Sequence, residues 1–266
     1  MSYRIFVINL PEALERRQRM CSHLAELGLD SAVIIDAVRG SELSATERAL
    51  QADDARSVAR YGRTLTAGEL GCALSHVRAY EHLLASSDDF ALILEDDAVL
   101  LPDVVGLLHS EPVRDWLMQP EPRLLLMTPV RAFLERGALP LVEGYRLVKV
   151  RRAWQGYGYV VNRAAAEVMR YINSPAWLSA DDWVAYRKLG GVELLGVDPF
   201  CIGFLDTAPS HLEDDRRRAE TAPGRSRSID ARLEKWTRQL MDLVYYRPIW
   251  GLGRHRIHPG WPANRK

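Results

Sequence analysis

The sequence predicts a layered α/β protein whose mixed, mostly parallel sheet is flanked by helices. Short apolar runs alternate along the chain with longer segments of helical periodicity, and this alternation is typical of sheets covered by helices. The chain has 266 residues, of which 47% are hydrophobic, so it can bury a sizeable core. No internal repeat is present.

Seven apolar runs have the length of buried strands. The first opens the chain, and the third is followed directly by three acids, Glu95, Asp96 and Asp97. The last follows a short helical segment late in the chain. The expected strands are residues 3–10, 32–35, 90–94, 123–127, 145–150, 158–162 and 192–197.

Helical segments separate these runs. The first should end at Gly28, because glycine commonly follows the last turn of a helix. Thr66 and Glu69 form a T-x-x-E capping box, which predicts the start of a second helix. Residues 41–64 are polar without a clear period, which indicates a loop or short helices. The expected helices are residues 12–27, 66–85, 163–172, 181–189 and 229–246.

The composition excludes several classes of protein. The formal net charge is zero, so nothing draws the chain as a whole to nucleic acid. Three cysteines that are far apart, Cys21, Cys72 and Cys201, cannot form a complete disulfide framework and favour a reducing compartment. We expect neither a signal peptide nor a membrane anchor at the start, and no window of 18 apolar residues exists that would span a bilayer.

The three acids after the strand at 90–94 need an explanation, because clustered carboxylates repel one another. Ligands of open α/β sheets bind beyond the carboxyl ends of strands. Hard divalent cations such as Mg²⁺ and Mn²⁺ prefer carboxylate oxygens and share them with substrate phosphates. The acids alone are equally compatible with an acidic turn that follows a buried strand.

A pair of linked motifs, GELGCALSH at 68–76 and ILEDD at 93–97, resembles glycosyltransferase family 25. The resemblance covers about residues 3–205 and departs from the family around Val161–Ala165. It implies a GT-A type, Rossmann-like fold, a UDP-sugar donor, a divalent metal (Mn²⁺ or Mg²⁺) and inversion at the anomeric carbon. The further matching residues are Ile8-Asn9-Leu10, Arg16, Arg17, Ala37, Gly40, Gly156-Tyr157-Gly158-Tyr159, Asp181 and Asp182.

The resemblance assigns a role to each acid. Asp97 is the expected metal ligand, Glu95 faces ribose or uracil, and Asp96 faces the donor sugar or a water on the metal. A general base must take the acceptor proton, and either Asp181 or Asp182 is expected to do so. The remaining expected donor-binding residues are Asn9, Arg16, Arg17, Ala37, Gly40, Ser75 and His76, and His211 is a second expected metal ligand.

Each of these residues also has a structural interpretation. Glu69 is the reciprocal partner in the Thr66 cap. Ser75 and His76 lie on one helix and are compatible with packing roles, as is Cys72. Arg16 and Arg17 are also compatible with a solvated helix surface, and acids such as Asp181 and Asp182 are common at helix N-termini.

Three parts of the chain are expected. Residues 1–210 form the catalytic domain, residues 211–228 a flexible charged loop, and residues 229–266 a helix with a basic, aromatic tail. Residues 245–266 carry five Arg/Lys and no acid, and their aromatic rings suit a membrane interface. We therefore expect a cytoplasmic protein whose tail contacts the anionic inner membrane; packing of the tail on the domain is the alternative.

The expected activity is transfer of a hexose, galactose from UDP-galactose, to an oligosaccharide or lipid-linked acceptor of lipooligosaccharide or lipopolysaccharide. Transfer of glucose from UDP-glucose is an alternative. A non-catalytic binding or adhesion protein of the same family is another, although such a protein should lose an acid of the metal motif. A Mg²⁺ phosphohydrolase would need a further cluster of ligands, and the sequence has none of comparable quality.

Overall fold

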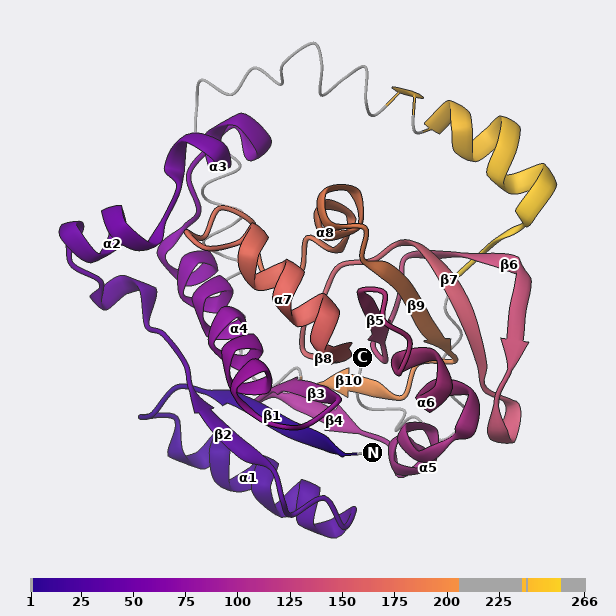
Figure 1. Cartoon of the computed structure of the whole chain (residues 1–266), viewed down its shortest axis with the longest axis horizontal. Helices are drawn as coiled ribbons and strands as arrows, with labels where there is room; N and C mark the ends of the chain where they lie inside the picture. Colours follow the sequence, from indigo (N-terminus) through magenta and orange to yellow (C-terminus); the bar gives the residue numbers. More distant parts are fainter. Residues whose placement is uncertain (1, 206–235, 238, 255–266) are drawn as a thin grey trace.

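The computed structural model describes residues 2–205, 236, 237 and 239–254 (Figure 1). Nine strands form one sheet, and two further strands pair separately. The strands of the large sheet are β1 (Tyr3–Asn9), β2 (Val33–Asp36), β3 (Phe90–Glu95), β5 (Arg123–Leu126), β6 (Ala132–Pro140), β7 (Arg146–Arg152), β8 (Gly158–Asn162), β9 (Glu193–Asp198) and β11 (Leu252–Gly253). The separate pair is β4 (Ala98–Leu100) with β10 (Ile202–Phe204).

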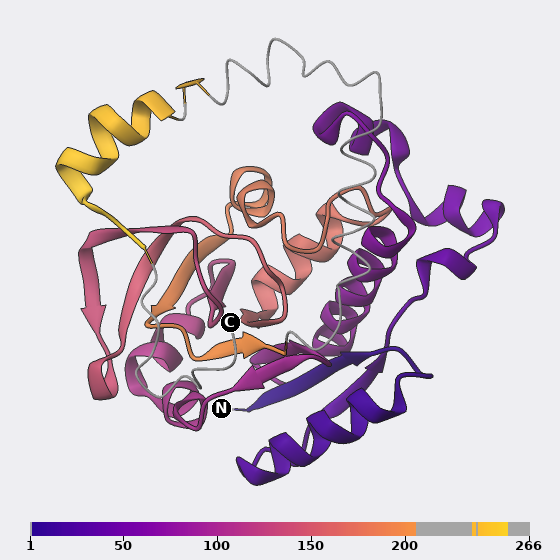
Figure 2. The ribbon, with the colours of Figure 1, turned by 180° about the vertical axis from the view of Figure 1, so that it is seen from behind.

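Helices cover both faces of the large sheet. Two of them, α4 and α7, lie side by side on one face, whereas α1 lies on the opposite side of β1 and β2 (Figures 1 and 2). The helices are α1 (Leu14–Glu26), α2 (Ala45–Gln51), α3 (Asp54–Tyr61), α4 (Ala67–Ala85), α5 (Asp103–His109), α6 (Glu111–Leu117), α7 (Arg163–Ile172), α8 (Trp183–Gly190) and the helical segment η3 (Asp242–Trp250), with short 3₁₀ turns η1 (Gly40–Glu42) and η2 (Val142–Gly144).

Alternation along β1 divides the core into two layers, because successive side chains of a strand point to opposite faces. Phe6 and Ile8 pack in the layer that contains buried residues of α4, α7 and α8. Ile5 and Val7 pack in the layer that contains buried residues of α1, α5 and α6. Both faces are therefore apolar, which explains why the strands appear in the sequence as continuous apolar runs.

The strand order in the sheet is β11-β6-β7-β9-β5-β8-β3-β1-β2. The sheet is mixed. One direction is shared by β1, β2, β3, β5, β6 and β9, and the opposite direction by β7, β8 and β11. The reversed strand β8 lies between β3 and β5, so the segment that precedes β8 reaches the same edge as the carboxyl ends of β1 and β3. This arrangement confirms the predicted α/β class with a mixed sheet whose strands run mostly one way.

The structure also contains elements that the sequence did not predict. Strand β6 contains Gly137 and Pro140 and has exposed side chains over most of its length, so it lacks the pattern of a buried strand. Helices α5 and α6 have seven residues each, too short for a clear helical period. The polar segment 41–64 forms the short helices α2 and α3, which is one of the two expected outcomes.

The C-terminal part is described only in pieces. Segment η3 stays helical through Pro248 to Trp250, beyond the expected end at residue 246. The loop expected at 211–228 lies outside the described residues. Among the helices of the described ranges, none has the length and apolar character that a bilayer crossing requires.

Candidate active site

The three acids lie at the carboxyl end of β3, and Arg16 is the cation beside them. The guanidinium of Arg16 is 3.1 Å from Oδ1 of Asp96. Nδ2 of Asn9, at the end of β1, donates to Oδ2 of the same carboxylate over 2.7 Å. Arg19, on the same helix as Arg16, donates to the Asp96 carbonyl. Burial nevertheless raises the pKa of Asp96, with a smaller contribution from Glu95. Its ionised form therefore depends on Arg16 and Asn9.

Asp97 differs from Asp96 in its surroundings. Its Oδ1 atom is buried and has no hydrogen-bond partner among the described residues. Burial, followed by the charges of Glu95 and Asp96, raises the pKa of Asp97 to about 7. A buried carboxylate oxygen without a donor is costly, and a divalent cation is the ligand that would remove this cost.

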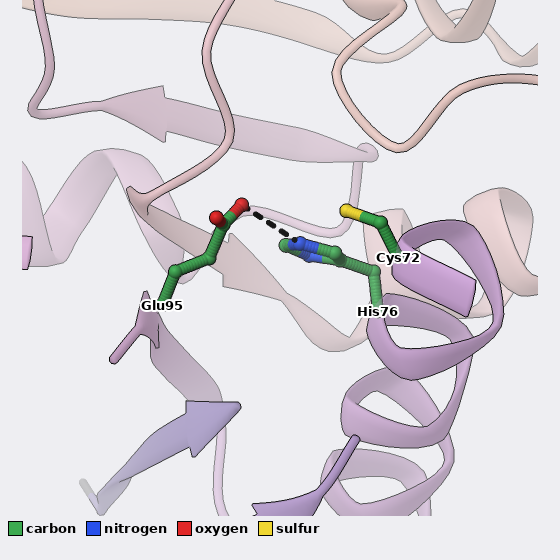
Figure 3. Close-up of side chains that lie close together, drawn as sticks. All are labelled: Cys72, His76 and Glu95. Atoms are coloured by element: carbon green, nitrogen blue, oxygen red, sulfur yellow. Dashed lines mark hydrogen bonds and ion pairs between the residues drawn. The ribbon is translucent and has the colours of Figure 1, made fainter. Parts of the chain in front are cut away.

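A chain of polar contacts connects Glu95 to the helix behind it. Nε2 of His76 lies 3.4 Å from Oε1 of Glu95 (Figure 3). Nδ1 of His76 lies 2.7 Å from the Tyr159 hydroxyl, which is 2.9 Å from the hydroxyl of Tyr80. His76 is 1% exposed, so its ring is held by these contacts and not by solvent. Sγ of Cys72 lies in the same group of atoms.

The motif residues on α4 also fix the loop after β2. Oγ of Ser75 accepts from the Val38 N–H over 2.8 Å and donates to the Gly71 carbonyl over 2.6 Å. A Cβ at Gly40 would lie 1.9 Å from the Ala67 carbonyl oxygen, and a Cβ at Gly71 would lie 2.4 Å from the Val38 carbonyl oxygen. The backbones of the loop after β2 and of α4 can approach this closely only because Gly40 and Gly71 have no Cβ. Ser75, Gly40 and Gly71 therefore hold the loop after β2 against α4.

The two candidate bases have different environments. Asp182 accepts from Arg60 over 2.6 and 2.9 Å and from the Tyr61 hydroxyl over 2.8 Å. It also caps α8 through the Ala185 N–H, and it is 1% exposed. All of these contacts are structural, so Asp182 acts as a helix cap and ion-pair partner.

Asp181 lies near Glu95, on the other side of Gly156. The Ser179 hydroxyl donates to its Oδ1 over 2.6 Å, and the Gln155 N–H donates to its Oδ2 over 3.3 Å. A Cβ built on Gly156 would lie 3.5 Å from Oε1 of Glu95, 3.7 Å from Cε1 of His76 and 3.8 Å from Cβ of Asp181. Gly156 is therefore the point at which β3, α4 and the segment before α8 meet.

The segment before β8 was expected only through the matching residues Gly156 and Tyr157, and its backbone contacts Asp181. Gln155 has a φ of 85°, a left-handed conformation that is uncommon for residues other than glycine. Trp183 donates to the Gln155 carbonyl, and Tyr157 donates to its side chain. Tyr157 also lies close enough to Asp97 and Glu95 for their charges to raise the pKa of its hydroxyl, after burial as the main cause. Gly156 and Gly158, on either side of Tyr157, were the available signal in the sequence.

The remaining residues that the sequence analysis singled out lie in different parts of the structure. Ala37 donates its N–H to the Asn9 carbonyl, next to the site. Arg17 is exposed on α1. Glu69 completes the capping box with Thr66 and accepts two hydrogen bonds from Arg63, so its structural interpretation is confirmed. His211 lies outside the described residues.

Residues 2–118 match the model of glycosyltransferase family 25 (LPS biosynthesis protein). Procollagen galactosyltransferase 1 of Danio rerio is 28% identical over 199 residues, which are 69% of this chain and 31% of that protein. The human inactive glycosyltransferase 25 family member 3 is 39% identical over 100 residues, which are 35% of this chain and 16% of that protein. The chain thus spans less than a third of the length of these relatives.

A solved structure, a putative glucose-1-phosphate thymidylyltransferase from Bacillus anthracis, covers 85% of this chain and 98% of its own. Its TM-score is 0.39 and its identity 12%, too low to assign a fold or an activity. The relatives include both a galactosyltransferase and an inactive protein, so similarity alone does not decide activity. The predicted relationship to glycosyltransferase family 25 is confirmed for residues 2–118, the segment that carries Glu69, His76 and the three acids.

Proposed function

We propose that this protein is a metal-dependent, inverting glycosyltransferase that moves a hexose from a nucleoside diphosphate sugar to a saccharide acceptor. The observation that carries the proposal is the buried, unpartnered Oδ1 of Asp97 at the carboxyl end of β3. It lies in a segment whose relatives include a galactosyltransferase.

Asp97 would hold the cation, Mn²⁺ or Mg²⁺, together with oxygens of the diphosphate. When bound, the cation neutralises the charge that develops on the leaving diphosphate. Glu95 is 29% exposed and would contact the nucleoside. Asp96 is already paired with Arg16 and Asn9, so its role is to position Arg16 beside the diphosphate.

Asp181 is the proposed general base. In the reaction, the acceptor hydroxyl oxygen forms a bond to the anomeric carbon while the bond from that carbon to the diphosphate oxygen breaks. The hydroxyl proton passes to the Asp181 carboxylate, and the nucleoside diphosphate leaves with the bonding electron pair. The hydrogen bonds from Ser179 and Gln155 orient the carboxylate for this transfer.

The proposed donor is UDP-galactose, with UDP-glucose as the second candidate, and the proposed acceptor is a lipopolysaccharide-type saccharide. The name of the Danio rerio relative supports galactose, and the description of the family model supports the acceptor.

Release of UDP from UDP-galactose and UDP-glucose, with and without Mn²⁺, tests the proposed function. We expect release to require the cation and to rise several-fold when a lipooligosaccharide core acceptor is added. Binding of UDP-sugar without release would instead indicate a non-catalytic family member. Release of phosphate from simple phosphate esters would indicate a phosphohydrolase.

We further propose that the C-terminal tail holds the enzyme at the cytoplasmic face of the inner membrane. Residues 245–266 carry five positive charges and no acid, and Leu243, Val244 and Ile249 of η3 are exposed. Tyr246, by contrast, packs on the domain, because the Arg151 guanidinium lies 4.3 Å above its ring. Each basic residue near an anionic surface contributes about 1 kcal/mol.

Sedimentation with vesicles of anionic lipid tests this contact. The full chain should bind at low salt and largely dissociate at high salt, and a version that ends at Asp242 should not bind. A version that ends at Arg254 keeps β11 and is the matched control for folding. Equal binding of all three versions, or binding of none, would exclude the tail as the segment that contacts the membrane.

A further inference from the structure

A second group of potential metal ligands lies beside the three acids. Cys72 and His76 are four residues apart on α4 and therefore share one face of the helix. Glu95 approaches them from the end of β3 (Figure 3). One ligand atom from each residue, a thiol sulfur, an imidazole nitrogen and a carboxylate oxygen, lies within 4.8 Å of the other two.

The chemistry of these ligands differs from that at Asp97. Thiolate and imidazole suit Zn²⁺, whereas Mn²⁺ and Mg²⁺ prefer oxygen. In tetrahedral zinc sites the ligand atoms lie about 2.0–2.3 Å from the ion and hence about 3 to 4 Å from one another. The 3.4 Å separation between His76 and Glu95 is already in this range, and the Cys72 sulfur lies within 4.8 Å of both ligand atoms.

The histidine is also oriented for coordination. Its Nδ1 is 2.7 Å from the Tyr159 hydroxyl, and Nε2 is directed at Glu95. Metal-bound histidines usually have their second nitrogen held by a hydrogen bond in this way. Cys72 and Glu95 are half-buried, so an ion can reach their ligand atoms.

We propose that Cys72, His76 and Glu95 form a binding site for a thiophilic divalent cation, with Zn²⁺ the best match. Three protein ligands leave a fourth position for water or another ligand. The cation would connect α4 to the end of β3. Because Cys72 must lose its proton when it binds, affinity should rise with pH.

Titration of the full chain with Co²⁺ alone tests the site, because thiolate-bound Co²⁺ absorbs in the near ultraviolet. We expect one equivalent to give this band and Zn²⁺ to displace it. Cys72→Ser should abolish the band, whereas Cys21→Ser, at an exposed cysteine on α1, should retain it. Tyr159→Phe should weaken binding about 10- to 100-fold, because it removes the partner of His76.

Two outcomes would overturn the proposal: no thiolate band in the wild-type protein, or a band of equal strength in Cys72→Ser. Asp97→Asn separates the two metal sites. It should keep the cobalt band, and loss of the band in a folded Asp97→Asn protein would also count against a distinct site.

One consequence rests on the proposed function. Glu95 belongs to the proposed donor pocket, so Zn²⁺ should inhibit UDP release from wild type at least tenfold more strongly than from Cys72→Ser. If no UDP is released by any variant, the proposed function fails while the cobalt titration still decides the metal site. Equal inhibition of both proteins would exclude Zn²⁺ at Cys72 as the cause.

Discussion

Asp97→Asn is expected to lower turnover by about 10³-fold, because the cation is held by this carboxylate and contributes several kcal/mol in reactions of this type. The change keeps the shape of the side chain and removes its charge. Binding of Mn²⁺ and of the UDP-sugar should weaken together, which a thermal-shift titration with each ligand measures. Near wild-type turnover in this variant would exclude Asp97 as the metal ligand.

The same substitution should stabilise the metal-free protein at neutral pH. The pKa of Asp97 is about 7 in the folded protein and ordinarily near 3.8. The folded state therefore binds the proton more tightly, and stability is lost as the pH rises through this interval. The free energy of unfolding of wild type relative to Asp97→Asn should fall by about 2 to 4 kcal/mol between pH 4 and 8, measured with urea in a chelator. If the difference in the free energy of unfolding between wild type and Asp97→Asn did not change with pH, the buried charge of Asp97 would not be the cause.

Asp181→Asn is expected to lower turnover by about 10²- to 10⁴-fold, the range typical of a lost general base. Affinity for the UDP-sugar should stay within about twofold, because the base acts on the acceptor. Single-turnover kinetics and a donor binding isotherm measure the two effects separately.

Asp182→Asn is the matched control, since it is the adjacent residue and undergoes the same chemical change. It should cost about 2 kcal/mol or more of stability, because the carboxylate accepts from Arg60 and Tyr61. The folded protein should keep its turnover. Loss of turnover in folded Asp182→Asn, with normal turnover in Asp181→Asn, would transfer the role of base to Asp182.

Strands and helices with strong local signals were predictable. The apolar run before the acids predicted β3, and the T-x-x-E pattern predicted the start of α4, where both hydrogen bonds of the capping box are present. Strand β6 was missed because its stabilisation comes from neighbours on both sides, β7 and β11, and not from a pattern of its own. The residues of a strand do not show which other strands will pair with it.

The sequence predicted the three acids at the end of β3, and not the contacts that each acid makes. The resemblance gave Asp96 a contact with the donor sugar or with a water on the metal, and only the structure shows that the carboxylate is paired with Arg16 and Asn9. The distinction between Asp181 and Asp182 depends on Arg60, which is more than 120 residues away in the chain. Cys72 was interpreted as a packed helix residue, and only the approach of Glu95 places its sulfur among potential ligands.

The reversed strand β8 has a consequence for how the molecule can be divided. The segment with the family match ends at residue 118, whereas β3 pairs on one side with β8, which begins at residue 158. A fragment that stops at residue 118 would leave Phe90–Leu94 as an open, wholly apolar sheet edge. Exposed edges of this kind pair with other chains, so such a fragment would self-associate. We therefore expect that residues 2–118 do not fold on their own, because strand β8 from the later part of the chain completes their sheet.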